Sequence, residues 1–130
     1  MQSATNTTVF ATFPAPLLCS RVDPTMGAVV LTVSGPLTTA HHVASLRRSL
    51  ESVPEGFSLI IELDGMTTLS TTGLAGIRDL AGCAAALGVC LVLVSESIDV
   101  RANLILSDLD SLAPVLHNLA QARQVVALAA

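Results

Sequence analysis

The chain has 130 residues, of which 52% are hydrophobic but only 2% are aromatic, and its formal net charge is −4. This length suits one domain, which buries about two thirds of its unfolded surface, so leucine, valine, isoleucine and alanine must build the core. The sequence has no lysine and no stripe of arginines, which argues against binding to nucleic acid.

The sequence predicts a cytoplasmic protein without membrane insertion. The apolar, uncharged run at residues 80–95 is shorter than the roughly 20 residues that cross a bilayer. The first basic side chain is Arg21, whereas a signal peptide begins with positive charge. Cys19, Cys83 and Cys90 form no Cys-x-x-Cys pair, so we interpret them as buried free thiols, with a redox role of Cys83 and Cys90 as the alternative.

The first part of the chain predicts a tail and a hairpin. Residues 1–14 are polar and unpatterned and are expected to form a flexible tail, followed by one domain over residues 15–130. Residues 16–22 and 28–34 are predicted as two strands, because a five-residue loop with proline and glycine separates two apolar runs.

A helix is predicted next, with Thr38 or Thr39 as its N-cap. Its apolar residues are spaced three and four apart and share one face: Val43, Leu46, Leu50 and Val53. The pair His41-His42 does not predict a metal site, because adjacent helical side chains diverge. We expect both histidines at a solvated helix start.

The stretch 58–74 joins a buried strand to a helix. Residues 59–63 are an apolar run of strand length, and Asp64-Gly65 predicts a turn that ends it. After a short loop, Ser70, Thr71 or Thr72 is expected to cap a helix whose apolar positions are Leu74, Ile77, Ala81, Ala84 and Ala85. The three hydroxyls therefore lie at the positive end of a helix, where anions are favoured.

The rest of the chain continues the alternation of strands and helices. Gly88 is a C-cap before an apolar strand at 89–94, and a helix is predicted over 98–106. A short edge strand is expected at 111–115, and Asn118-x-x-Gln121 resembles a capping box before a last helix with Leu119, Ala122, Val126 and Ala129 inward. This order predicts an α/β fold with a mixed, mostly parallel sheet of four to five strands and about four helices.

The junction motif resembles the core of the STAS domain (sulfate transporter and anti-sigma factor antagonist). Its small bacterial members carry Asp-Ser-Ser-Gly-Leu at the start of a helix, and here the motif is Ser70-Thr71-Thr72-Gly73-Leu74. The resemblance covers nearly the whole chain from Pro16 and implies a STAS-like fold. It also implies phosphorylation of Thr71 by an anti-sigma factor of the serine/threonine kinase type, with Ser70 and Thr72 as alternatives. The family's Gly-Glu-Leu-Asp corresponds to residues 35–38 (Gly-Pro-Leu-Thr), so both acids of that segment and the aspartate at position 70 are replaced.

The helix after the motif has a second face that is small and nearly uncharged. Ala75, Arg78, Asp79, Gly82 and Ala86 follow at spacings of three and four, opposite Ile77, Ala81 and Ala84. Small side chains allow a partner helix to approach closely, so this face is either a docking strip or an ordinary alanine-rich surface.

The resemblance implies an anti-sigma factor antagonist, a protein-binding switch without enzymatic activity or cofactor. The expected partner-binding residues are Thr38, Ser70, Thr71, Thr72, Gly73, Ala75, Arg78, Asp79 and Gly82. The alternative is a STAS accessory subunit of a phospholipid or anion transporter, which binds constitutively without phosphorylation. No catalytic pair accompanies Asp64, which we interpret as a turn residue.

Overall fold

The computed structural model describes residues 17–129, so the expectation for the tail at 1–14 lies outside the described residues. The elements follow in the predicted order: β2 (Leu17–Asp23), β3 (Ala28–Leu37), α1 (Ala40–Glu51), β4 (Ser58–Leu69), α2 (Thr71–Leu87), β5 (Leu91–Val94), α3 (Ile98–Leu106), the 3-10 helix η2 (Leu109–Ser111), β6 (Val115–Leu116) and α4 (Leu119–Ala129).

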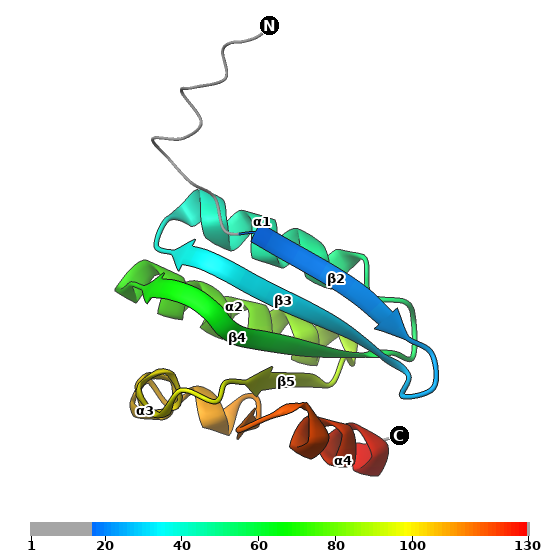
Figure 1. Ribbon diagram of the computed structural model, residues 1–130. Coiled ribbons are helices and arrows are strands. Elements are labelled where there is room, and N and C mark those ends of the chain that lie inside the picture. Colours follow the sequence, from blue (N-terminus) through cyan, green and yellow to red (C-terminus); the bar gives the residue numbers. More distant parts are fainter. Residues whose placement is uncertain (1–16, 130) are drawn as a thin grey trace, which may run out of the picture.

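The strands form one mixed sheet in the order β2-β3-β4-β5-β6 (Figure 1). β2 and β3 are an antiparallel hairpin, and the other three pairings are parallel. The prediction of a mixed, mostly parallel sheet with about four helices is therefore confirmed for the described residues. Parallel neighbours need a helix as crossover connection, and α1 and α2 provide it for β3–β4 and β4–β5.

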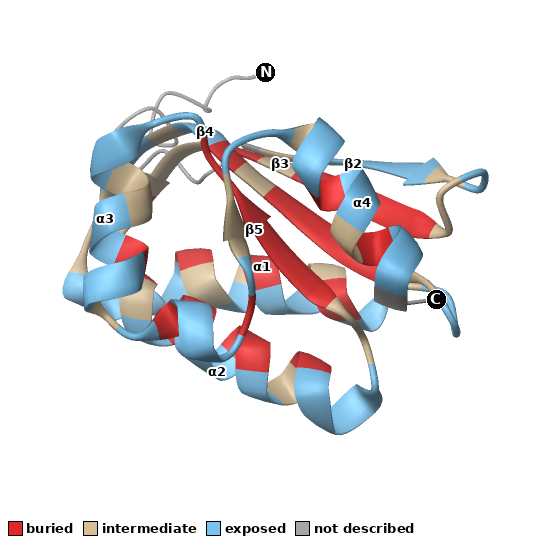
Figure 2. Cartoon of the chain, turned by 90° about the horizontal axis from the view of Figure 1, so that it is seen from below, coloured by how far each residue is buried: buried red, intermediate tan, exposed pale blue. Residues whose placement is uncertain are grey.

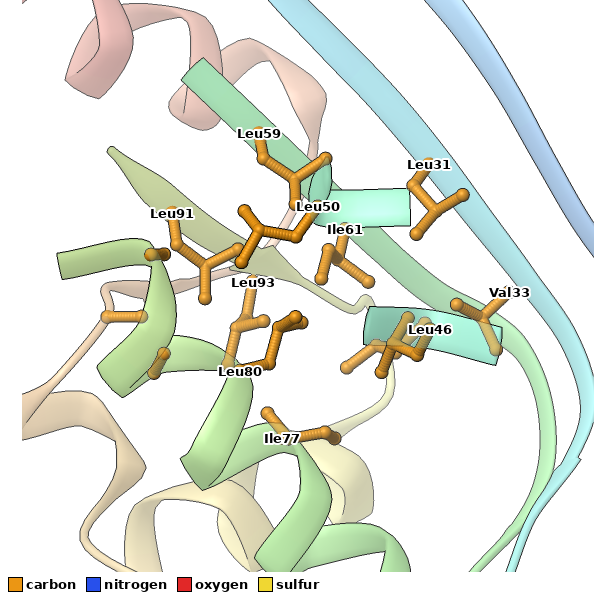
Figure 3. Packing of buried hydrophobic residues seen from close by; sticks show 14 of the residues in the cluster. Leu31, Val33, Leu46, Leu50, Leu59, Ile61, Ile77, Leu80, Leu91 and Leu93 are labelled. Atoms are coloured by element: carbon orange, nitrogen blue, oxygen red, sulfur yellow. The ribbon is translucent and has the colours of Figure 1, made fainter. Parts of the chain in front are cut away.

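Alternate residues of the central strands point to opposite faces of the sheet, and helices cover both. Leu59, Ile61 and Leu63 of β4 face the larger core, which α1 and α2 close with Leu46, Leu50, Ile77 and Leu80 (Figure 3). Ile60 points to the other face, where Ala122 and Val126 of α4 cover it. Figure 2 shows α1 and α2 on one side of the sheet and α4 on the other. Double coverage explains why β4 and β5 contain continuous apolar runs.

The last helix begins as its sequence predicts. The backbone N–H of Gln121 donates to Asn118 Oδ1 at 3.0 Å, and the Gln121 side chain accepts from the N–H of His117 at 2.8 Å. These are the two reciprocal bonds of a capping box, with one difference: the Gln121 side chain bonds to the N–H of His117 instead of the N–H of the N-cap residue Asn118. Ala122 and Val126 face inward as expected.

β4 differs from the prediction, because it continues through Asp64-Gly65 to Leu69. β3 also extends further than expected and pairs with this second half, with Ser34 opposite Gly65 and Leu37 opposite Leu69. Gly65 permits this close pairing, since a Cβ there would lie 2.6 Å from Ser34 Oγ. The second half is largely exposed, so it lacks the apolar run that marks the first half, and the predicted turn is wrong.

The expected edge strand at 111–115 is also corrected. Residues 109–111 form η2 with Leu109 buried in the larger core, and only Val115–Leu116 pair with β5. Asp108 initiates η2 in the left-handed conformation, with φ 63°, which aspartate tolerates better than most residues. Within the described residues, no helix combines the length and the hydrophobicity that crossing a membrane requires.

Candidate functional site

Ser70 is the N-cap of α2. Its backbone is extended, its Oγ accepts a hydrogen bond from the Gly73 N–H at 3.1 Å, and its carbonyl accepts from the Leu74 N–H at 2.9 Å. Of the three hydroxyl residues that were candidates for the cap, Ser70 therefore takes this role. Thr71 and Thr72 are the first two residues of the helix, and both are exposed.

Ser70 also connects α2 to the loop between β3 and α1. Its hydroxyl donates to the Thr38 carbonyl at 3.1 Å, and its backbone N–H donates to the Leu37 carbonyl at 3.3 Å. Two predicted site residues that lie 32 positions apart in the sequence are thus in direct contact. In the family pattern both positions are acidic, whereas here an uncharged hydroxyl at position 70 donates to the backbone carbonyl of Thr38.

Sequence analysis missed His42 as a residue that supports this site. The structure places His41 in solvent but buries His42, whose Nδ1 accepts the Thr38 N–H at 3.2 Å. Thr39 caps α1 by accepting from the His42 N–H at 3.2 Å. The expectation that both histidines are solvated is therefore wrong for His42. The available signal was the spacing of His42, Leu46 and Leu50, which puts the imidazole on the buried face of α1.

Two glycines let the start of α2 approach its neighbours. A Cβ on Gly73 would lie 2.1 Å from the Leu37 carbonyl oxygen, and one on Gly76 would lie 2.3 Å from a methyl group of Val43. Both distances are far below contact distance, so these positions require glycine. Gly73 is buried, so it contributes to the site by allowing close packing. The accessible groups are the neighbouring Thr71 and Thr72.

The N-terminal end of α2 presents two hydroxyls in a positive field. The first turn contains no acidic side chain, and the first N–H groups of a helix have no intrahelical partner. The Gly73 N–H donates to the Ser70 hydroxyl, which is uncharged. No negative side chain therefore compensates the positive end of the helix macrodipole around Thr71 and Thr72. This arrangement favours an anionic group attached to, or bound beside, either threonine.

The two faces of α2 divide as the spacing predicts. Ile77, Ala81 and Ala84 are buried, and the opposite residues are exposed: Ala75, Arg78, Asp79, Gly82 and Ala86. Ala85, which was expected among the apolar face, is exposed as well. The Arg78 guanidinium donates to the carbonyl of Ser107, which follows α3, so this arginine links α2 to the end of α3. Whether the exposed face binds a partner stays a prediction.

Asp64 has a structural contact that its assignment to a turn did not foresee. Its Oδ1 accepts from the Ser95 hydroxyl at 3.1 Å and from the Glu96 N–H at 2.7 Å. These bonds attach the middle of β4 to the segment that connects β5 with α3. The described part of the chain holds no cluster of three or more histidine, cysteine or acidic side chains arranged to bind a metal ion.

Cys83 and Cys90 pack against different cores of the protein. The two thiols lie on opposite sides of the sheet, and all three cysteines are free. Cys19 on β2 is exposed, so the interpretation as a buried thiol is wrong for this residue. Cys83 lines an open groove of about 270 Å³ at the far end of α2, where Arg47 Nη2 lies 3.5 Å from its Sγ.

Comparison with known proteins agrees with this architecture. Residues 21–122 match the family model of the STAS domain, while no curated protein sequence matches the chain. An anti-sigma factor antagonist from Mycobacterium paratuberculosis is similar in structure, with 19% identity, a TM-score of 0.71, and coverage of 86% of this chain and 94% of that chain.

Two further structures have the same fold. A sulfate transporter family protein from Wolinella succinogenes has 18% identity and a TM-score of 0.69, with 84% of this chain and 91% of that chain covered. The phosphorylated form of the Bacillus cell fate determinant SpoIIAA has 15% identity and a TM-score of 0.60, with 84% and 99% covered. At these identities the likeness establishes the fold, and the resemblance drawn from the junction motif is confirmed at the level of the family.

Proposed function

Because the chain belongs to the STAS domain family, we propose that it is an anti-sigma factor antagonist that docks an anti-sigma factor through the start of α2. The observation that carries this proposal is the division of roles at the junction. Ser70 holds the helix start in place, while Thr71 beside it is exposed at the positive end of the helix. A regulatory hydroxyl needs both a rigid support and access for a kinase.

Thr71 is the proposed site of phosphorylation. The Ser70 hydroxyl forms two hydrogen bonds inside the protein, so its modification would break the cap and the link to Thr38. The Thr71 hydroxyl lies outside that arrangement, and a phosphate there stays close to the first-turn N–H groups. Thr72 is also exposed and is the alternative on the same turn.

A phosphate on Thr71 would change the charge of this surface from neutral to strongly negative. The first turn of α2 has no acid, and Thr38 and Ser70 replace the acids of the family pattern. Phosphorylation adds nearly two negative charges. Burying an unpaired charge in an interface costs several kcal/mol, whereas about 1.4 kcal/mol already weakens binding tenfold. One modification is therefore sufficient to release a partner.

The proposed docking surface consists of the threonines and the exposed face of α2. Its members are Thr38, Thr71, Thr72, Ala75, Asp79 and Gly82, with Ser70, Gly73 and Arg78 as supporting residues. Small side chains at 75 and 82 allow close approach of a partner backbone. The proposed partner is an anti-sigma factor of the serine/threonine kinase type, and the protein itself is proposed to act by binding rather than by catalysis.

A second candidate is an accessory subunit of a membrane transporter that binds constitutively. The observation in its favour is the replacement of the family aspartate by Ser70, together with the similar fold of a sulfate transporter family protein. In that case the same face of α2 binds the transporter, and no phosphate is transferred to the threonines.

Phosphate incorporation from ATP by the anti-sigma factor of the same organism separates the two candidates. We expect labelling of the wild type, loss of labelling in Thr71→Ala, and retained labelling in the neighbouring control Thr72→Ala. Thr71→Glu is expected to keep the melting temperature, because a carboxylate is favourable at a helix N-terminus, and to weaken the complex at least about tenfold. Absence of labelling, together with unchanged binding of Thr71→Glu, would refute the switch. Labelling of Thr72 alone would move the site by one residue.

A further inference from the structure

The helix α3 exposes an apolar face to solvent, and no other element of the described residues 17–129 covers it. Leu104 is its one buried side chain, and the exposed residues Ile98, Ala102, Ile105 and Leu106 follow at positions i, i+4, i+7 and i+8. This is the spacing of the buried stripe of an amphipathic helix, but here it points outward. Ile98 is 72% exposed, Ile105 49% and Leu106 85%. We call these four residues the α3 face.

Acidic side chains lie at both ends of α3. Glu96 and Asp99 lie at the start of the helix, Asp108 and Asp110 follow its end, and all four are exposed. They are four of the ten acids in the chain, gathered within 15 residues that hold a single arginine. That arginine, Arg101, donates to the Ser95 carbonyl at 2.8 Å. The exposed face of the helix is therefore apolar, and negative charge is concentrated at its two ends.

Hydrogen bonds attach both ends of the helix to the domain, which suits a preformed binding surface. Arg101 and the Ser95 hydroxyl, which accepts from the Ser97 N–H at 3.1 Å, attach its start to the end of β5. Arg78 attaches its end to α2 through the Ser107 carbonyl. A rigid apolar surface loses little conformational entropy when a partner covers it.

We propose that the α3 face is a second docking surface, which binds a partner protein through an apolar helix or groove flanked by arginine or lysine. The charge pattern selects this occupant, because basic side chains at the partner's rim complement the four acids. A second copy of this chain would bring the same acids together across a two-fold axis, and an anionic lipid surface would be repelled. The inference does not depend on phosphorylation of Thr71.

A titration of the isotope-labelled full-length protein with a short amphipathic helical peptide of leucine and arginine tests the proposal. Amide NMR signals of Ile98, Ala102, Ile105 and Leu106 are expected to shift, while those of Thr71 and Thr72 stay in place. The matched peptide with glutamate instead of arginine is expected not to bind. Leu106→Ser should weaken binding of the arginine peptide at least about fivefold, and the control Leu128→Ser, which alters an equally exposed leucine on α4, should leave it unchanged.

The charge contribution is tested by the triple variant E96Q/D108N/D110N, which keeps side-chain size and, at residue 108, the tolerance of asparagine for a positive φ. It should weaken binding about tenfold and reduce its dependence on salt. Peptide shifts that map elsewhere, or a triple variant that binds as tightly as wild type, would overturn the proposal. So would a concentration-dependent dimer that Leu106→Ser abolishes, adsorption to anionic vesicles through α3, or movement of the α3 signals when residues 1–16 are removed.

Discussion

The start of α2 depends on residues that have no side chain or a very short one. Gly73 lies against the backbone of Leu37, and the Ser70 hydroxyl is small enough to reach both the Gly73 N–H and the Thr38 carbonyl. These contacts place Thr71 at the surface above a tightly packed helix start. The chemistry proposed for Thr71 therefore depends on the close packing of its neighbours.

Two glycines of α2 make a matched pair for testing this packing. Gly73→Ala is expected to destabilise the protein by about 2 kcal/mol or more, because the new methyl group would meet the Leu37 carbonyl and force the backbone to move. Gly82→Ala is expected to stabilise it by up to about 1 kcal/mol, since the position is helical and open. Chemical denaturation measures both. A stable Gly73→Ala variant would show that α2 does not pack as closely as the structure has it.

The two histidines of α1 make a second pair. His42→Leu leaves the Thr38 N–H without its acceptor and is expected to cost about 1–3 kcal/mol, whereas His41→Leu should change little because that side chain is exposed. Thermal unfolding compares them. The prediction fails if the two variants unfold at the same temperature.

At the scale of elements, β4 has two halves with different tasks. Residues 58–63 are buried between the two helical layers, and residues 64–69 continue beside β3 at the surface and lead into α2. Irregular register between β3 and β4, at Thr32/Ser34 and at Gly35/Pro36, accompanies this change. Pairing with β3 to its last residue is what brings Ser70 against Thr38.

A charge placed in each half distinguishes these tasks. Ile61→Asp is expected to prevent folding, because Ile61 is 1% exposed and an unpaired buried carboxylate is very unfavourable. Thr67→Asp, in the exposed half, should fold with nearly the wild-type stability. Circular dichroism and thermal melts give the comparison. A folded Ile61→Asp protein would contradict the placement of the first half.

At the scale of the molecule, the sheet separates two cores, and this separation decides the behaviour of the cysteines. Cys83 and Cys90 are seven positions apart in the sequence but pack on opposite faces of the sheet. A disulfide needs Cα atoms within about 7 Å and converging side chains. Their positions on opposite faces therefore argue against pairing in the folded state.

We accordingly expect that mild oxidation of the native protein forms no disulfide between Cys83 and Cys90. The mass of the protein should then not decrease by the two hydrogens that such a disulfide would remove. The same treatment in denaturant, where the chain is flexible, serves as the positive control. Mass spectrometry of peptides makes the test. A Cys83–Cys90 cross-link formed without unfolding would support the redox role that the sequence left open.

The sequence by itself determined the order of elements, the two buried strands, the two faces of α2 and the family motif at its start. Each of these depends on local periodicity or on a short motif, and periodicity reports burial directly when an element is apolar on one face or on both. The capping residue could be narrowed only to three neighbouring hydroxyls, because each is chemically able to cap.

Only the tertiary structure decided which of them caps, and why. The second half of β4, the burial of His42 and the bond from Ser70 to Thr38 all arise from contacts between segments about 30 positions apart in the chain or from the packing of a polar side chain. The exposed half of β4 and the bond from Ser70 leave no periodic trace, because exposed strand residues and loop hydroxyls carry no apolar pattern. His42 does share the spacing of Leu46 and Leu50, but as a polar side chain it does not extend the apolar pattern of α1. The outward apolar face of α3 was hidden for the opposite reason, since an apolar stripe in a sequence does not reveal whether it points to the core or to solvent.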